Sequence, residues 1–272
     1  MAIPKDKLES WSRPGKNELS NDTYTKMETV IKNNVSNTEI FLQGSYANST
    51  NVRDNSDIDI VVLLKGWTYS DWPLMKNVKN ARDFLFNIIN GKDNFQFVKG
   101  NKCVKYKGGV KYYVPADLVP CVEYSANGYD GIAIYDHGTG NLIANYPKQH
   151  RENGEKKSSD TDGNFKKTVR MFKNARNFAV DRNLLGKDHC PSYCLECLLY
   201  NVDDKCFSGD EHDVFLNVLN FLQKNRYSLS NFKTQNNIQY MFSGFDPCWN
   251  TSYAQTAIEK IAYVWNDWDK IR

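Results

Sequence analysis

The sequence predicts an α/β (α+β) protein in which a lobe built on a mixed sheet is followed by a C-terminal helical lobe. Short apolar runs, some with period-two alternation, fill the first half of the chain, and apolar stripes at helical spacing fill the second half. The chain has 272 residues, of which 40% are hydrophobic and 25% charged, so it is long enough for two lobes. This composition excludes the collagen-like and disordered classes.

The order of the expected elements places the sheet before the helices. In the first half these are a helix at 20–33, strands at 38–42 and 56–64, a helix at 74–88, and strands at 95–98, 102–107 and 110–122. The polar segment Arg151–Gly163 has no periodicity and predicts a link between the lobes. Three later stripes predict helices, and they consist of Phe165, Val169, Phe172 and Ala179; Val214, Val218 and Phe221; and Ala254, Ile258, Ile261, Trp265 and Trp268.

We therefore expect one domain at residues 1–160 and a second at 161–272. The alternative, an independent helical module that binds a partner, is disfavoured because the second part has only about 110 residues and no break in composition precedes it.

No segment predicts contact with a membrane. The longest apolar stretch, Ile58–Leu64, is interrupted by Asp59 and is far shorter than the roughly 20 residues that cross a bilayer. The N-terminal residues lack the apolar segment of a secretory signal, so we expect a cytoplasmic protein. In that compartment the seven cysteines are expected to be reduced.

Positive charge is concentrated in one stretch of the chain. The net charge is only +3, which does not by itself indicate nucleic-acid binding. Residues 146–187, however, hold eleven Lys and Arg against five Asp and Glu, a local charge of +6. This stretch favours an anionic ligand, and a solvated helix face is the alternative.

Two aspartates open the most apolar strand. Asp57 and Asp59 lie two residues apart, so on a strand both carboxylates emerge on one face while Ile58 and Ile60 enter the core. On a surface strand such a pair is commonly just solvated. Here it begins a buried strand, where like charges are tolerated when a cation offsets them, and the spacing therefore predicts a metal site.

A glycine-serine turn precedes this strand. Gln43, Gly44 and Ser45 follow the preceding apolar run, and because glycine has no Cβ, the amide and hydroxyl of Ser45 can approach a phosphate. Alone, the pair is an ordinary turn. Together with Asp57 and Asp59 it predicts metal-dependent phosphoryl or nucleotidyl transfer.

A two-metal reaction of this kind requires a third carboxylate. Asp117 is the only charged residue in the apolar run Tyr112–Val122, and an unpaired buried aspartate is costly. We therefore expect Asp117 beside Asp57 and Asp59 across the sheet. The alternative is an aspartate that turns the chain between two prolines.

Charge balance predicts a use for the basic stretch. Three carboxylates (about −3), a triphosphate (about −4) and two divalent cations leave about −3 for protein cations to offset. Lys166, Arg170 and Lys173 form a stripe at i, i+4 and i+7 of an expected helix. We expect this stripe to face a nucleotide cleft.

These motifs together resemble a known family. The likeness is carried by the stretches FLQGSYANSTNVRDNSDIDIVVLL, VPADLVP, GNLIANYPKQH, FKKTVRMFKNARN and PSYCLECLLYNV. They resemble the bacterial cGAS/DncV-like nucleotidyltransferases, also called CD-NTases or the SMODS family, over about Phe41 to Val202. The resemblance implies a polymerase-β-like nucleotidyltransferase lobe plus a C-terminal helical lobe that closes the nucleotide cleft. The last 70 residues are similar only as helices.

The resemblance implies a template-independent enzyme. Such an enzyme joins ATP, GTP, CTP or UTP into a cyclic di- or trinucleotide second messenger, releases pyrophosphate and uses two Mg²⁺ or Mn²⁺ ions. It also implies a role in CBASS antiphage signalling, with an operon-encoded effector that responds to the product. The matching residues are Asp57, Asp59 and Asp117 for the metals; Gln43, Gly44 and Ser45 for the phosphate turn; Lys173 and Ser192 for the donor triphosphate; Tyr193 for base stacking; and Asn145 for the acceptor base.

One residue complicates the contacts to the triphosphate. Glu196 lies one turn beyond Ser192, and we expect it to repel a phosphate unless it pairs with Lys173 or Arg170. Arg170 is counted with Lys173 among the candidate nucleotide contacts.

His189, Cys190, Cys194 and Cys197 have a spacing that zinc ligands can have. We nevertheless expect Cys194 and Cys197 to be core residues of a helix, because leucines surround them. Other histidines are expected at the surface, namely His137, His150 and His212. A set of alternating lysines is expected to protect a sheet edge, with an RNA- or partner-contacting ridge as the alternative: Lys99, Lys102, Lys105, Lys107 and Lys111.

Two rival functions stay open at this point. The same chemistry can make a linear oligonucleotide or nucleotidylate a small molecule, RNA or protein, and the same fold can serve as an inactive nucleotide- or RNA-binding module. The presence of three carboxylates argues against the inactive module. No motif determines the choice of bases or a 3′–5′ against a 2′–5′ linkage.

Overall fold

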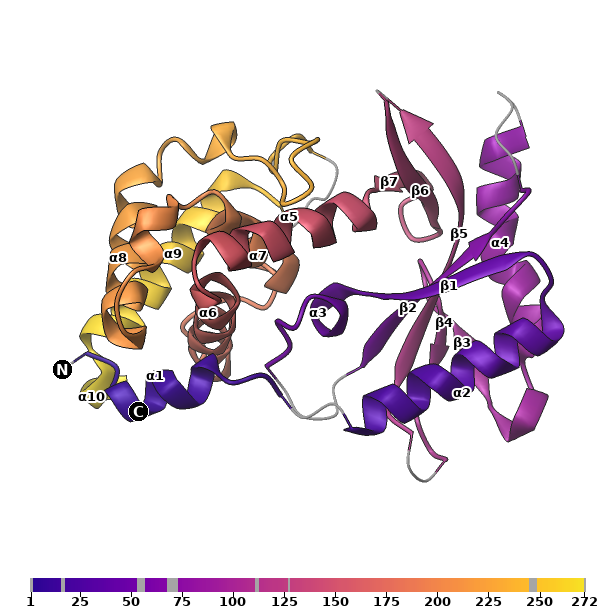
Figure 1. Cartoon of the computed structure of the whole chain (residues 1–272), viewed down its shortest axis with the longest axis horizontal. Coiled ribbons are helices and arrows are strands. Elements are labelled where there is room, and N and C mark those ends of the chain that lie inside the picture. Colours follow the sequence, from indigo (N-terminus) through magenta and orange to yellow (C-terminus); the bar gives the residue numbers. More distant parts are fainter. Residues whose placement is uncertain are drawn as a thin grey trace. The chain divides into compact units, whose positions relative to one another are not determined.

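The computed structural model describes residues 2–15, 18–52, 57–67, 73–110, 113–126, 128–244 and 249–271. They form two compact units (Figure 1). The helical unit comprises residues 1–14, 48–52 and 149–272, and the sheet unit comprises residues 15–47 and 53–148. The division falls at residues 148 and 149 instead of the expected 160 and 161, and two short N-terminal segments belong with the C-terminal helices.

A mixed sheet forms the framework of the sheet unit. Its strands run in the order β1-β2-β5-β4-β3, and β5 also pairs with β6, which pairs with β7. The β2–β5 pair is parallel and the other pairs are antiparallel. The elements are α2 (Glu18–Asn34), β1 (Thr38–Gln43), α3 (Gly44–Ala47), β2 (Ile58–Leu64), α4 (Pro73–Ile89), η1 (Lys92–Asn94), β3 (Phe97–Lys99), β4 (Val104–Tyr106), β5 (Ala116–Ala126), β6 (Tyr129–Asp136) and β7 (Asn141–Asn145).

Alternation along the strands gives this sheet two different faces. On one face, Met27 of α2 and Leu85 of α4 belong to the same hydrophobic cluster as Ile60 of β2. On the other face, Val61 and Val119 belong to a second cluster that includes residues of β6. The face opposite α2 and α4 is therefore where odd-numbered residues of β2 and β5 emerge.

The sequence located most of these elements but missed β6 and β7. The helices and the first strands lie where their periodicity predicts, whereas β5 begins at Ala116 and extends to Ala126 instead of covering residues 110–122. In β6 the apolar alternation is limited to Ile132 and Ile134, and its ends are polar. Pairing with β5, rather than a strong local pattern, accounts for this strand.

Helix α6 is the centre of the helical unit and contacts α1, α7, α8 and α9. Phe172 of α6 stacks on Phe215 of α8 with ring centroids 4.4 Å apart, and Phe215 stacks in turn on Trp265 of α9 at 5.0 Å. The three predicted stripes thus supply one core. The elements are α1 (Lys5–Ser12), α5 (Pro147–Asp160), α6 (Asn164–Asp181), α7 (Ser192–Tyr200), η2 (Asp204–Phe207), α8 (Glu211–Asn225), η3 (Leu229–Asn231), α9 (Thr251–Asn266) and α10 (Trp268–Ile271).

The prediction of a polar link at 151–163 is wrong, because most of this segment is helix α5. The buried side of α5 carries polar or small residues, including Gly154, Lys157 and Ser158, so no apolar stripe marks it in the sequence. Tertiary contacts hold it instead. Nζ of Lys157 donates to the carbonyl oxygen of Val202 (2.8 Å) and to Asp204 (2.5 Å).

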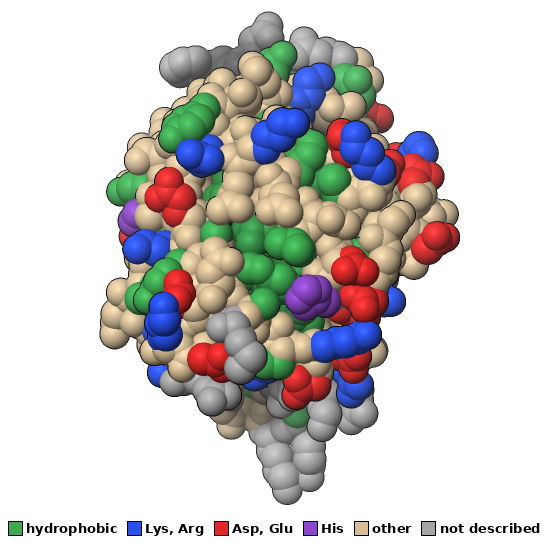
Figure 2. Space-filling view, turned by 90° about the vertical axis from the view of Figure 1, so that its left-hand side faces the viewer, with side chains coloured by type: hydrophobic (Ala, Val, Ile, Leu, Met, Phe, Trp, Pro, Cys, Tyr) green, Lys and Arg blue, Asp and Glu red, His purple; other side chains and the backbone are tan. Residues whose placement is uncertain are grey.

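The surface agrees with the modest net charge. On the face shown in Figure 2, Lys and Arg side chains are interspersed with Asp and Glu, so neither sign dominates there. In the described part of the chain, no helix combines the length and the apolar character that crossing a membrane requires.

Candidate active site

Four polar side chains form a row across neighbouring strands of the sheet unit. Gln43 of β1 is opposite Asp59 of β2, Asp59 is opposite Asp117 of β5, and Asp117 is opposite Lys105 of β4. Alternation places all four on the face that lies opposite α2 and α4. The predicted proximity of Asp59 and Asp117 is therefore what the structure shows.

The buried residues that flank Asp59 and Asp117 along their strands explain the position of the row. Ile58 and Ile60 flank Asp59 and have no exposed surface, as the alternation predicts, and Ala116 and Leu118 flank Asp117 in the same way. Their burial determines which face the two carboxylates occupy. A shift of either strand by one residue would place charges in the core, so this register is strongly specified.

Gly44 allows the turn after β1 to lie against Asp59. Its backbone has φ +70°, and a Cβ built at this position would lie 2.5 Å from Oδ2 of Asp59. Ser45 follows at the beginning of the short helix α3 and is half-buried. The predicted phosphate turn and the carboxylates are thus neighbours in the structure.

Burial and like charge act together on Asp59. Desolvation of its carboxyl group, followed by repulsion from Asp117 and then Asp57, raises the pKa of Asp59 to about 6, and Lys105 partly opposes this shift. A carboxylate with a raised pKa beside a second carboxylate is a site that a cation would stabilise. The donors are oxygens, which Mg²⁺ and Mn²⁺ prefer.

Asp57 is exposed and directly precedes β2. Within the described ranges, no three Asp, Glu, His or Cys side chains are arranged so that they could hold one metal ion. Mg²⁺ is usually held by one or two carboxylates together with water and substrate phosphates. The pair formed by Asp59 and Asp117 therefore fits a metal site that a nucleotide completes.

Lys105 is a member of the row that sequence reasoning assigned to a different role. Its Nζ donates to Oδ2 of Asp117 at 3.0 Å, and the pairing raises the pKa of Lys105. The expectation that Lys105 only protects a sheet edge is wrong, because β4 lies between β5 and β3. The local sequence does not reveal that Lys105 pairs with Asp117, because the register of β4 on β5 brings them together.

Asn145 also lies in the sheet unit, at the end of β7. Its Nδ2 donates to Oε1 of Gln43 at 3.4 Å, and its Oδ1 accepts from the backbone amide of Tyr146 at 2.9 Å. Two residues that the family resemblance singled out, 102 positions apart, therefore touch.

The cations of the expected phosphate-facing stripe pair with groups of the helical unit. Lys173 has 2% of its surface exposed, and its Nζ lies 2.8 Å from Oε2 of Glu196 and 3.0 Å from Oγ1 of Thr50. The buried guanidinium of Arg170 donates to the backbone carbonyls of Ser12 and Ser49. Each of these two cations is held by groups of its own unit, and the contact of the stripe with a nucleotide stays a prediction.

Glu196 is the centre of this buried network. Its carboxylate accepts from Thr50 at 2.9 Å and from Asn48 at 3.4 Å, and Nε2 of His150 lies 3.3 Å away. Although desolvation opposes it, attraction by Lys173 and His150 lowers the pKa of Glu196 well below its usual range. The condition under which Glu196 would not repel a phosphate, pairing with Lys173, is met.

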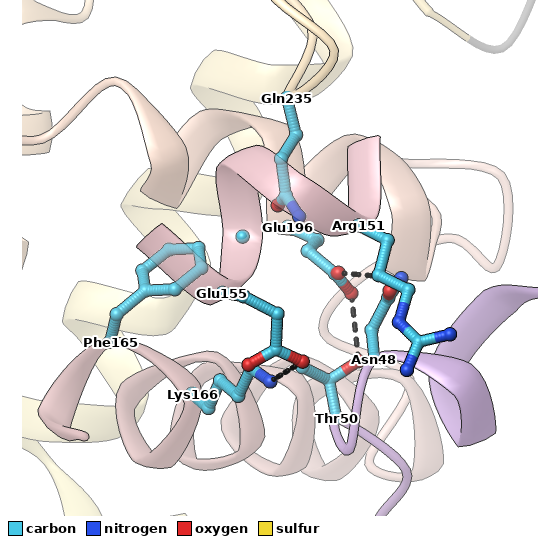
Figure 3. Close-up of a pocket in the computed structure, with 9 residues that line it drawn as sticks. Asn48, Thr50, Arg151, Glu155, Phe165, Lys166, Glu196 and Gln235 are labelled. Atoms are coloured by element: carbon cyan, nitrogen blue, oxygen red, sulfur yellow. Dashed lines mark hydrogen bonds and ion pairs between the residues drawn. The ribbon is translucent and has the colours of Figure 1, made fainter. Parts of the chain in front are cut away.

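The network borders a small polar pocket (Figure 3). The carboxylate of Glu196 points toward Thr50 in this view, whereas Glu155 pairs with Lys166 on another wall. The third cation of the expected stripe, Lys166, is thus also paired, at 2.7 Å.

Ser192 and Tyr193 are exposed at the beginning of α7. The ring of Tyr193 lies 5.1 Å from that of His150 and 5.0 Å from that of Trp249, measured between centroids. The prediction that His150 is a surface residue is wrong, since only 7% of it is exposed. Its partners Glu196 and Tyr193 are more than 40 positions away, so no local pattern reveals its burial.

Three cysteines of the helical unit lie in its core. Cys190, Cys194 and Cys197 are buried in one hydrophobic cluster, as predicted for Cys194 and Cys197. His189 stacks on Tyr253 with ring centroids 4.1 Å apart.

Comparison with known proteins places this geometry among nucleotidyltransferases. Residues 25–130 match the nucleotidyltransferase domain, and residues 152–266 match the cGAS/DncV-like nucleotidyltransferase C-terminal helical domain. The chain is 32% identical to the cyclic UMP-AMP synthase of Rhodothermus marinus (strain SG0.5JP17-172), over 98% of this chain and 99% of that protein. It is 31% identical to the cyclic nucleotide synthase CdnE01 of Staphylococcus haemolyticus, over 98% and 100%. The structure of Rhodothermus marinus CdnE c-UMP-AMP synthase with Apcpp and Upnpp gives a TM-score of 0.84 at 30% identity, over 98% of this chain and 97% of that one.

Gly44→Ala is expected to destabilise the protein more than Gly91→Ala. Both glycines have positive φ, so each substitution costs about 1–2 kcal/mol of backbone strain. Nothing lies within 4 Å of a Cβ at Gly91, whereas a Cβ at Gly44 meets Asp59, which adds about 1 kcal/mol. Urea unfolding of the two variants measures the difference, and equal losses would contradict the contact.

Asp59 should make stability depend on pH in metal-free protein. Because its pKa is raised from 3.8 to about 6, the folded state favours the neutral acid, and the free energy of unfolding falls as pH rises between these values. Asp59→Asn is therefore expected to be more stable than wild type at pH 8 by about 1–2 kcal/mol, and similar to it near pH 4. Urea unfolding with a chelator tests this. Glu123→Gln, at an exposed position of β5, is the control, and an equal gain in it would refute the assignment to Asp59.

Glu196→Gln is expected to lower the free energy of unfolding by about 3–5 kcal/mol at pH 7, because it leaves the buried ammonium of Lys173 without its charge partner. Glu155→Gln breaks an ion pair whose carboxylate is 54% exposed and should cost less than about 1 kcal/mol. Since the pKa of Glu196 is lowered, its contribution is present above the usual glutamate range and is lost on acidification. The two variants should therefore differ strongly at pH 7, and the difference should shrink as pH falls below about 4, the ordinary range of glutamate. Losses of equal size at pH 7 would contradict the network.

Proposed function

The chain belongs to the cGAS/DncV-like nucleotidyltransferase family, and on this premise we propose that it joins nucleoside triphosphates into a cyclic di- or trinucleotide and releases pyrophosphate. Similarity to two cyclic nucleotide synthases over almost the whole chain supports this activity. The observation that carries it is the row in which Asp59 and Asp117 lie side by side next to the Gly44 turn.

Asp57, Asp59 and Asp117 are the proposed ligands of two Mg²⁺ or Mn²⁺ ions. When bound, such ions would lower the pKa of the acceptor hydroxyl and neutralise the departing pyrophosphate. The chain's own contribution is to bring two carboxylates to one point on a buried sheet, where desolvation and like charge raise the pKa of Asp59. Because Gly44 has no side chain, a phosphate bound beside the two carboxylates could come close to the backbone of Gly44 and Ser45.

Other side chains are proposed to hold the nucleotides. Ser192 and Tyr193 are exposed at the beginning of α7, which supports contact of Ser192 with a phosphate and of the Tyr193 ring with a base. Lys173 is proposed as a triphosphate contact that a phosphate would share with Glu196, and the backbone contacts of Arg170 support the segment that carries Thr50.

Asn145 is the proposed contact to an acceptor base, and Gln43 of the proposed phosphate turn is its hydrogen-bond partner. Their side chains hydrogen-bond each other at the end of β1 and β7, so each amide has its orientation set before a base binds. Amide donors and acceptors of this kind can discriminate between base edges. Mass spectrometry of products made from mixed ATP, GTP, CTP and UTP would identify the bases.

In the cell, we propose that the product is a second messenger of an antiphage system, made in the cytoplasm and sensed by an effector encoded in the same operon. Membership of the family supports this role. Resistance of the product to phosphatase would distinguish a cyclic from a linear product, because a ring has no terminal phosphate.

Asp59→Asn and Asp117→Asn are each expected to reduce pyrophosphate release by about a thousandfold or more, because each removes a proposed metal ligand at the reaction centre. Release is measured with mixed triphosphates and Mg²⁺ or Mn²⁺. Glu123→Gln serves as a matched control on β5 and should keep wild-type activity. Full activity in either aspartate variant would remove the proposed site.

A further inference from the structure

Lys105 has a position that the proposed reaction does not use. It lies on β4, beside the strand that carries Asp117, and its Nζ lies 3.0 Å from Oδ2 of that aspartate. The side chain of Asp117 is 23% exposed and that of Lys105 is 41% exposed. The ammonium of Lys105 is therefore hydrogen-bonded to one oxygen of the Asp117 carboxylate, and both side chains remain partly exposed to solvent.

Neighbouring lysines of the same hairpin serve other partners. Lys99 pairs with Asp83 at 3.0 Å, and Lys102 lies 3.5 Å from Asp136. Neither aspartate belongs to the row. The pairing of Lys105 with Asp117 follows from the β4–β5 register, which brings these two residues directly opposite each other.

The charges of the row explain why a cation is needed there. Asp59 and Asp117 are adjacent across β2 and β5, and Asp57 acts on Asp59 as a further like charge. One ammonium offsets only part of this charge. A divalent ion that binds Asp59 and Asp117 would offset more, and it would compete for the carboxylate of Asp117, whose Oδ2 Lys105 now contacts.

We propose that Lys105 is the counter-ion of Asp117 in the metal-free site, and that a divalent cation displaces it from that carboxylate. This rests on the proposed function, because it takes Asp117 as a metal ligand. Lys105 then neutralises Asp117 from β4, on the far side of Asp117 from Asp59, and sets the cation concentration that the site requires. The half-exposed, flexible lysine can leave the carboxylate at low cost, since its ammonium moves into water.

Binding of Mn²⁺ alone, without nucleotide, tests the competition. Electron paramagnetic resonance of free Mn²⁺ gives a dissociation constant for wild type, Lys105→Met, Lys105→Arg and Lys107→Met. Lys105→Met keeps the aliphatic stem and removes the competing charge, so it is expected to bind Mn²⁺ about tenfold more tightly. Lys105→Arg keeps the charge, and Lys107→Met removes an exposed charge just beyond β4, so both should stay within about twofold of wild type. Urea unfolding of each variant confirms that it is folded.

The outcomes separate this proposal from the proposed function. Unchanged or weaker Mn²⁺ binding by Lys105→Met overturns the counter-ion role, and so does a gain of equal size in Lys107→Met. If no variant binds Mn²⁺ alone while wild type releases pyrophosphate with Mn²⁺ and triphosphates, the competition is overturned and the proposed function stands. If wild type neither binds Mn²⁺ nor releases pyrophosphate, the proposed function fails and the role of Lys105 fails with it.

Discussion

The repulsion between two neighbouring carboxylates is the constraint on which the sheet unit depends. The parallel pairing of β2 with β5 places Asp59 directly beside Asp117. Burial of the residues that flank each aspartate, isoleucines on β2 and an alanine and a leucine on β5, prevents either strand from turning its aspartate elsewhere. Burial of Asp59, together with repulsion from Asp117, raises the pKa of its carboxyl group. The absence of a side chain at Gly44 leaves room for the carboxylate of Asp59, and the ammonium of Lys105 offsets part of the negative charge of Asp117. Such repulsion is typical of sites whose stability is completed by a ligand.

In the helical unit, the buried charge is compensated by opposite charge. There, the carboxylate of Glu196 is surrounded by Lys173, His150 and Thr50, so opposite charges and hydrogen-bond donors meet in a site from which water is largely excluded. Such a network is costly to break because one partner would stay buried without compensation. It also ties residues 48–52 to α6 and α7 within one unit. Satisfied charge supports the structure here, whereas unsatisfied charge marks the candidate site of the sheet unit.

Sequence reasoning predicted the residues that obey a local period. The alternation of β2 predicted the face on which Asp59 emerges, and the buried run around Asp117 predicted that this carboxylate would lie beside it. Helical stripes located α6, α8 and α9. What it missed has no period: α5 buries polar residues, and β6 depends on pairing with β5. It also misplaced His150, whose partners come from distant helices.

By itself, the sequence determined the fold class, the direction in which each amphipathic strand and helix faces, and the residue types available for phosphoryl chemistry, because these follow from spacing along one chain. Only the tertiary structure decided which charges meet. The register of β4 on β5 turned Lys105 from an edge residue into the partner of Asp117, and the packing of α7 against α6 turned Lys173 from a free cation into the partner of Glu196. Coulombic energies and desolvation depend on distances between residues far apart in the chain, and folding alone sets those distances.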